Sequence, residues 1–300
     1  MLSLRDYREH IGLDEPFAPP SLRPHPGEIE QWAEALLRRL FLHEGRPIQM
    51  PTWTPRQALQ AALTKRSARP FPPGFLEQLD GLLSVETAAA SLTDSAMLPT
   101  IEGSSCVLWK GDIARLKVDA IVNAANSALL GCFQPFHACI DNRIHAVAGP
   151  RLRQDCQRIM DLQGSAEPTG TAKLTRAYHL PSQYVVHTVG PICSAATTVA
   201  SHKQSEALAA CYRACLDAAA ALPTISSIAL CCISTGEFGF PREQAAQIAI
   251  RTVTDWLRRH PRRLDRVIWN VFTDQDERIY NAQLSTGSSP LHRVMGMASL

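Results

Sequence analysis

Three soft metal ligands and two asparagines lie close together near the middle of the chain. Cys132, His137 and Cys139 fall within a stretch of eight residues. Thiolate and imidazole groups suit zinc, and three protein ligands with a vacant fourth position are typical of catalytic zinc sites. Shortly before them, Asn123 and Asn126 offer amide donors and acceptors that suit the hydroxyls of a ribose. Together these residues predict chemistry on a bound nucleotide sugar.

Other interpretations of the same residues stay open. Asparagine is common in turns for local reasons that involve no ligand. The two cysteines of the motif are alternatively ordinary buried thiols beside a surface histidine. A closed structural zinc site is a further alternative, with its fourth ligand supplied by a distant cysteine such as Cys106, Cys193 or Cys231.

The segments that must position these residues alternate between strands and helices. Strand-like segments span residues 107–109, 120–122, 184–189, 227–233 and 266–272. Helical spacing marks residues 144–160, 203–222, 242–259 and 274–284. The alternation predicts a three-layer α/β/α domain with a mixed, largely parallel sheet. Because ligands bind beyond the carboxyl ends of parallel strands, the loops after Val122 and Ile233 should meet at the binding edge.

The first hundred residues have a different pattern. Prolines interrupt this part repeatedly, and helices fit between them at residues 29–42, 55–65 and 74–83. It carries no chemical motif, which favours a helical cover for the domain that follows. We therefore expect an N-terminal helical extension over residues 1–98, the α/β domain over 99–285 and a flexible tail over 286–300.

The composition excludes several classes of protein. With 300 residues, 45% hydrophobic and 19% charged, the chain is an ordinary globular one. A net charge of +2 and the lack of a long basic run argue against nucleic-acid binding. Its apolar segments are too short to span a membrane, and its N-terminus lacks the apolar core of a signal peptide. Nine cysteines, an odd number with several in predicted helices and strands, indicate a reducing, cytoplasmic compartment.

The order of the motifs resembles that of the macrodomain family, the ADP-ribose-binding α/β modules, and specifically its zinc-dependent branch. The resemblance covers residues 100–285, and the N-terminal segment is similar to the helical extension of that branch. Five segments carry it: GDI at 111–113, VDAIVNAAN at 118–126, LGCFQPFHACIDNRIH at 130–145, HTVGP at 187–191 and ISTGEFGFP at 233–241.

This resemblance implies which residues bind the nucleotide. Asp112 would accept a hydrogen bond from the adenine amine, Asn126 would contact the distal ribose, and the loop at 234–239 would hold the diphosphate near a helix N-terminus. From the residues alone, Asp112 is equally well a helix N-cap, and such a loop is ordinary in α/β proteins. The full expected set is Asp112, Ile113, Asn123, Asn126, Gly131, Ser234, Thr235, Gly236, Glu237, Phe238 and Gly239.

Asp141 is the expected catalytic acid or base, together with Asn126. In metal-free hydrolytic macrodomains a glycine-rich loop ends in an aspartate at the corresponding place, and here the zinc-ligand insertion replaces the glycines. The resemblance implies that Asp141 positions or activates water while zinc acts as a Lewis acid. Alternatively, Asp141 only caps a helix that starts near Ile144. His145 and His187 are interpreted as structural residues.

The expected function is therefore a zinc-dependent hydrolase that removes mono-ADP-ribose from modified proteins, with Zn²⁺ held by Cys132, His137 and Cys139. Its partners would be mono-ADP-ribosylated proteins and ADP-ribose, without nucleic acid or membrane. Two alternatives stay open. One is a non-catalytic ADP-ribose reader with structural zinc, and the other is a hydrolase of cyclic esters or nucleotide metabolites.

Overall fold

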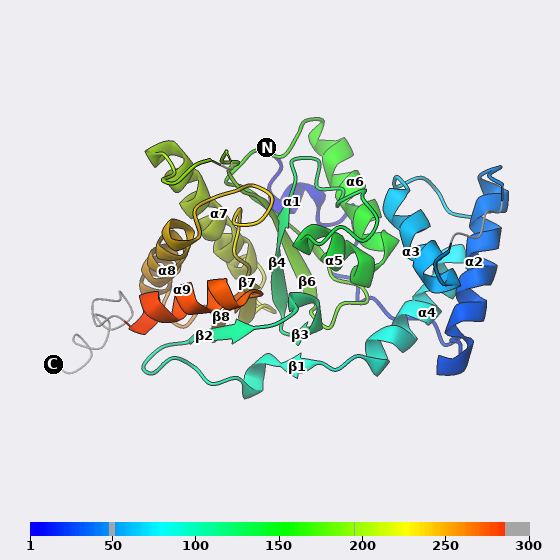
Figure 1. Ribbon diagram of the computed structural model, residues 1–300, viewed down its shortest axis with the longest axis horizontal. Helices are drawn as coiled ribbons and strands as arrows, with labels where there is room; N and C mark the ends of the chain where they lie inside the picture. The colour runs from blue at the N-terminus through cyan, green and yellow to red at the C-terminus, as the bar shows by residue number, and fades with distance from the viewer. Residues whose placement is uncertain (48–51, 195, 286–300) are drawn as a thin grey trace.

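The predicted sheet is present and contains six strands in the order β2-β8-β7-β4-β6-β5 (Figure 1). The computed structural model describes residues 1–47, 52–194 and 196–285. The strands of this sheet are β2 (Cys106–Lys110), β4 (Ala120–Ala125), β5 (Ala172–Arg176), β6 (Tyr184–Val189), β7 (Ser227–Leu230) and β8 (Arg266–Val271). A separate pair joins β1 (Thr93–Asp94) to β3 (Leu116–Lys117) in parallel.

Four of the five strand pairs in the sheet are parallel, and only the edge strand β5 runs antiparallel to its neighbour β6. β4 lies between β6 and β7, with Ala120 opposite both Tyr184 and Ile228. The carboxyl ends of these three strands therefore lie at one edge of the sheet. The mixed, mostly parallel sheet predicted from the sequence is confirmed.

Helices cover both faces of the sheet. Figure 1 shows α7, α8 and α9 on one side and α5 and α6 on the other. The bounds of the helices in the described ranges are α1 (Leu4–Tyr7), α2 (Ile29–His43), α3 (Pro55–Lys65), α4 (Phe75–Ala89), α5 (Ile140–Ala148), α6 (Pro150–Gln163), α7 (His202–Ala220), α8 (Arg242–Arg259) and α9 (Asp274–Ser285). Short 3₁₀ turns lie at Pro26–Glu28, Ser95–Met97 and Ile113–Arg115. Nowhere in the ranges that the structure describes is a helix long and apolar enough to cross a membrane.

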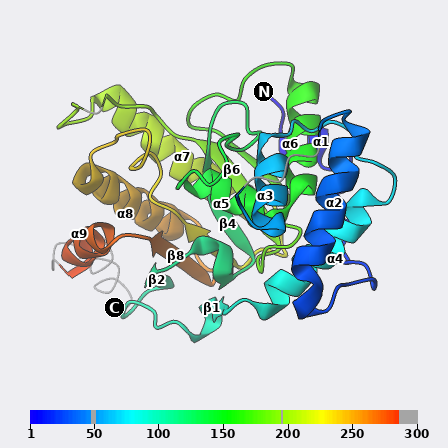
Figure 2. The same cartoon turned by 45° about the vertical axis from the view of Figure 1, so that its right-hand side comes forward.

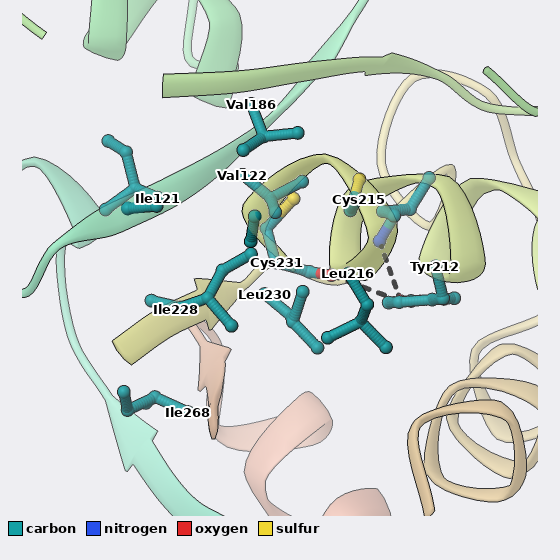
Figure 3. Close-up of a cluster of buried hydrophobic side chains, with 14 of the residues drawn as sticks. Ile121, Val122, Val186, Tyr212, Cys215, Leu216, Ile228, Leu230, Cys231 and Ile268 are labelled. Atoms are coloured by element: carbon teal, nitrogen blue, oxygen red, sulfur yellow. Dashed lines mark hydrogen bonds between the residues drawn. The ribbon is translucent and has the colours of Figure 1, made fainter. Parts of the chain in front are cut away.

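Part of the core lies where α7 packs against one face of the sheet (Figure 3). Branched aliphatic side chains of four neighbouring strands meet Cys215 and Leu216 of α7 there. Tyr212 lies in the same layer, and its hydroxyl donates to the Cys231 carbonyl at 3.1 Å and accepts from the Ile233 N–H at 3.3 Å. This core therefore also holds the segment that follows β7 in place.

The helices α2, α3 and α4 form a cluster of their own at one end of the molecule, beside α5 and α6 (Figures 1 and 2). Their apolar faces make a separate small core that includes Leu37, Leu59 and Leu79. Helix α3 begins where Thr54 accepts a hydrogen bond from the Gln57 N–H and a proline occupies the first turn. The stretch around α1 belongs instead to the main core, through residues such as Tyr7.

The continuous helix predicted over residues 144–160 is wrong. Gly149 has φ +83°, and the chain divides there into α5 and α6, with Pro150 opening the second helix. A glycine with positive φ ends a helix readily, and proline at a first helical position suits a new one. The other predicted helices and strands are present with shifted ends. The predicted tail at 286–300 lies outside the described residues, and the domain boundaries stay predictions.

Candidate active site

The predicted metal ligands meet at one point. We call residues 130–139, which lead from the end of β4 into α5, the metal loop. Ligand atoms of Cys132, His137 and Cys139 all lie within 4.8 Å of one another. Cys132 Sγ is 3.7 Å from His137 Nδ1, and His137 Nε2 faces Glu237 Oε1 at 3.6 Å. A carboxylate behind the second ring nitrogen is a usual neighbour of a metal-binding histidine.

Cys139 has a second role, at the start of α5. It is the N-cap residue, and its Sγ accepts from the Asn142 N–H at 3.4 Å. Burial raises the pKa of the Cys139 thiol to about 11. Metal binding requires the thiolate, so a bound cation would have to displace this proton.

Gly131 fixes the path of the metal loop. Its φ is +81°, and a Cβ added there would lie 2.9 Å from the ring of His145. The loop therefore runs directly against that buried imidazole. This close packing explains why the structure needs glycine immediately before Cys132.

We expect Gly131→Ala to destabilise the protein more than Gly164→Ala does. Both glycines have positive φ, but a Cβ at Gly164 would meet no atom within 4 Å. Gly164→Ala should cost about 1–2 kcal/mol through backbone strain. Gly131→Ala should cost about 1–3 kcal/mol more, because the methyl group overpacks the His145 ring. Urea unfolding measures both losses, and equal losses would contradict the packing described here.

Asn123 lies inside β4 and not in a turn, so the local structure expected for it is wrong. Its side chain is 0% exposed. Nδ2 donates to Asp141 Oδ1 at 2.8 Å and lies 3.1 Å from His187 Nδ1. Because an amide nitrogen only donates, His187 accepts at Nδ1, and its Nε2–H donates to Thr175 Oγ1 at 3.0 Å. Burial lowers the pKa of His187 to about 3, which keeps this ring neutral.

Asp141 is the second residue of α5, so it does not cap a helix that begins near Ile144. The residue is 5% exposed, and burial raises its pKa to about 6. Its Oδ1, the atom to which Asn123 donates, also lies 3.5 Å from His145 Nε2. A residue of β4 therefore orients the Asp141 carboxylate. Asp141 itself lies in the first turn of α5, directly after the N-cap Cys139.

Asn123→Ala should lower the free energy of unfolding by about 1–3 kcal/mol, because it leaves two buried groups without their donor. Asn126→Ala is the matched control from the same Asn-Ala-Ala-Asn segment. The hydrogen bonds of its half-buried amide stay within its own turn: it donates to Gly131 O at 3.2 Å and accepts from Ala128 N–H at 3.0 Å. The control should cost about 0.5–1.5 kcal/mol. Urea unfolding decides, and a larger loss for the control would contradict the arrangement around Asn123.

Asp112 is the N-cap of the 3₁₀ turn at Ile113–Arg115, as one of its two interpretations predicted. Oδ1 accepts from the Ala114 N–H at 3.0 Å. Oδ2 accepts two hydrogen bonds from Arg143, at 2.9 Å from Nε and 2.8 Å from Nη2. The carboxylate is thus fixed in direction while it borders the cavity described below. Its predicted contact with adenine stays a prediction.

The loop after β7, residues 234–239, is held at both ends. Ser234 has φ +65°, and its carbonyl accepts from the Phe240 N–H at 2.9 Å. The Phe238 carbonyl accepts from the Cys193 N–H at 2.7 Å. Gly190 allows the neighbouring strand end to approach, since a Cβ there would lie 2.0 Å from Ser234 Oγ. The loop therefore has a fixed shape next to the N-terminus of α8.

A cavity of about 620 Å³ lies between the metal loop and this second loop. It is lined by many of the residues predicted to bind metal or nucleotide. These are Asp112, Ile113, His137, Cys139, Ser234, Thr235, Gly236, Glu237 and Phe238. The other predicted residues are outside this lining: Asn123, Asn126, Gly131, Cys132, Asp141 and Gly239. The cavity size suits a ligand of nucleotide size.

Sequence reasoning missed several lining residues. Phe272, just after β8, is 73% exposed, and Asn270 lies in the same strand end. The rule that strand carboxyl ends form the site, applied to the last strand, would have found both. Arg143 could also have been predicted as a lining residue, since it follows Asp141 by two positions. Gln60 of α3 gave no signal, because only the packing of the N-terminal cluster brings it to the cavity.

Comparison with known proteins places these features in a family. The family model described as Macro domain matches residues 122–249. A Protein-ADP-ribose hydrolase of Treponema medium is 43% identical over 257 residues, covering 84% of this chain and 96% of the relative. This chain belongs to the macro domain family. The matched segment of the macro domain starts in β4 and contains both the metal loop and the loop at 234–239.

Solved macrodomains share the fold. A mutant Oceanobacillus iheyensis macrodomain with ADPR is 34% identical, with a TM-score of 0.55 and coverage of 67% of this chain and 98% of that one. A Trypanosoma brucei macrodomain in complex with ADP-ribose is 27% identical, with a TM-score of 0.57 and coverage of 74% and 94%. The predicted macrodomain fold is confirmed. The roles of individual residues in this macro domain stay predictions.

Proposed function

We propose that this protein is a zinc-dependent hydrolase that removes mono-ADP-ribose from modified proteins. One observation carries the proposal: two of the three clustered metal ligands, His137 and Cys139, line the same cavity as Asp112 and the loop at 234–239. A metal bound there would therefore sit beside a bound nucleotide. Relatives named Protein-ADP-ribose hydrolase, with identities above 40%, support the reaction class.

The donor set fits zinc. Two thiols and one imidazole, all half-buried, converge on one point, and His137 and Cys139 of this set face the cavity, which suits a soft cation with one open position. When bound by Cys132, His137 and Cys139, zinc would supply Lewis-acid stabilisation of an oxygen at the reacting end of the substrate. Glu237 would fix the orientation of the His137 ring from the opposite loop.

The rest of the cavity suits ADP-ribose. Asp112, held by Arg143, offers carboxylate oxygens to an exocyclic amine, and the exposed ring of Phe272 offers a flat apolar surface to a base. The main-chain N–H groups of the loop at 234–239 and the N-terminus of α8 favour a diphosphate. The distal ribose would then reach the metal loop.

Asp141 would act as the base that positions water for attack. Its Oδ1 is occupied by the hydrogen bond from Asn123, which leaves Oδ2 to accept the proton of a water molecule. A buried carboxylate with a pKa of about 6 stays largely ionised at pH 7 and is still basic enough for this transfer. Asn123 and His187 would act on the reaction only through the orientation of Asp141.

The test is the release of ADP-ribose from a protein that carries mono-ADP-ribose on acidic side chains. The zinc-loaded protein should release ADP-ribose, the chelated protein should not, and zinc should restore the activity. Binding of free ADP-ribose is measured in parallel by calorimetry. Binding without release in the zinc-loaded protein would overturn the hydrolase and indicate a reader. Release only from small ADP-ribosyl metabolites would overturn the protein substrate.

A further inference from the structure

Arg153 of α6 is a buried cation whose hydrogen bonds go to main-chain carbonyls. Only 6% of the residue is exposed. Its Nη1 donates to the carbonyls of Leu63, Thr64 and Arg66, at 2.9, 3.1 and 2.6 Å. Leu63 and Thr64 lie in the last turn of α3 and Arg66 is its C-cap, so these oxygens belong to the carboxyl end of the helix, where carbonyls need partners from outside it. The Leu63 carbonyl also accepts from the Arg66 N–H at 3.3 Å. The negative end of the α3 dipole thus compensates the buried charge.

The same guanidinium contacts the metal loop on both sides of Cys132. Its Nε donates to the Leu130 carbonyl at 2.7 Å, two residues before the thiol. The ring of Phe133, directly after the thiol, lies 4.5 Å from its Cζ. Arg153 therefore connects α3 of the N-terminal cluster to the segment that presents the first metal ligand.

We infer that Arg153 is a positioning residue that orders the metal loop, and that the N-terminal helices contribute to the site through it. Without α3, the guanidinium would lose three of its four carbonyl partners and a compensating helix end. The loop would then keep its Gly131 contact with His145 but lose its fixed point beside Cys132. The helices α2–α4 are accordingly more than a cover for apolar surface.

The inference is tested by two readouts. Only the second, zinc affinity, rests on the proposed metal site, and the first needs no metal. Hydrogen exchange of residues 130–139 is compared in the metal-free full-length protein and two variants. Arg153→Lys keeps the charge but cannot reach all four carbonyls, and it should speed exchange about tenfold. Arg151→Lys is the matched control from the same helix, because Arg151 contacts Asp80 of α4 at 2.8 Å and not the metal loop.

Equal exchange in Arg153→Lys and the parent would overturn the inference, and so would equal acceleration by Arg151→Lys. The second readout is zinc affinity, by competition with a chromophoric chelator. Arg153→Lys should raise the zinc Kd about 10–100-fold, and Arg151→Lys should leave it unchanged. A parent that binds no zinc would refute the proposed metal site, while the exchange data would still decide the role of Arg153.

Phe133→Leu provides a second variant that folds even if Arg153→Lys does not, since the Phe133 ring is partly exposed. Removing the ring over the guanidinium should speed exchange of the same segment by a factor of about two to five. In the double variant the two effects should not add, because each side chain acts through the other. Unchanged exchange in Phe133→Leu would contradict the inference that Arg153 and the Phe133 ring together order the segment around Cys132.

Discussion

Asp141→Asn should lower the rate of ADP-ribose release by about 100-fold or more, and should change the Kd for free ADP-ribose little. The new amide oxygen can still accept from Asn123 Nδ2, so the shape of the site is kept. What is lost is the ability to take a proton from water. The rate is measured at saturating ADP-ribosylated protein, and the Kd by calorimetry on the same preparation.

Asp119→Asn is the control for this prediction. Asp119 is a carboxylate just before β4, where it accepts hydrogen bonds from Ser226 and Ser227 at 2.9–3.0 Å. It lies at the amino edge of the sheet, opposite to the cavity. Its replacement should lower stability but leave the release rate per folded molecule unchanged. A normal rate in Asp141→Asn would remove this residue from the chemistry.

The alternation of strands and helices was enough to predict the sheet and the edge at which the cavity lies. Parallel strands must be joined by crossover helices, so apolar segments such as β4, β6 and β8 had few other arrangements. The edge strand β5 escaped prediction, since its sequence AKLTR carries little apolar signal. The break at Gly149 escaped as well, because helical spacing continues on both sides of it.

The residue types of the site were predictable, but their division of labour was not. The spacing of Cys132, His137 and Cys139 predicted a cluster, and the structure brings them together. No pattern in the sequence shows that Asn123 points into the protein, because this depends on the pairing of β4 with β6. The contact of Arg153 with α3 likewise depends on how two separate helical layers pack. Long-range packing of this kind leaves no local signal.

Cys139→Ser should raise the zinc Kd by more than about 100-fold, beyond what the loss of an outer-shell partner costs. Serine is a good N-cap, so the start of α5 should survive the change, whereas Cys139→Ala would remove cap and ligand together. Zinc content by mass spectrometry and the rate of ADP-ribose release should fall together. A loss of zinc and of activity in Cys139→Ser would therefore result from the missing metal ligand and not from disruption of α5.

Cys232→Ser provides the comparison for that result. Cys232 also borders the cavity, but its Sγ lies 3.8 Å from the Asn270 carbonyl and outside the cluster of metal ligands. The Cys232→Ser variant should retain the zinc content of the parent protein. If Cys139→Ser lost zinc but released ADP-ribose at the parent's rate, the metal would be structural and Asp141 would carry the reaction without it. If both cysteine variants kept zinc, the ligand set itself would be wrong.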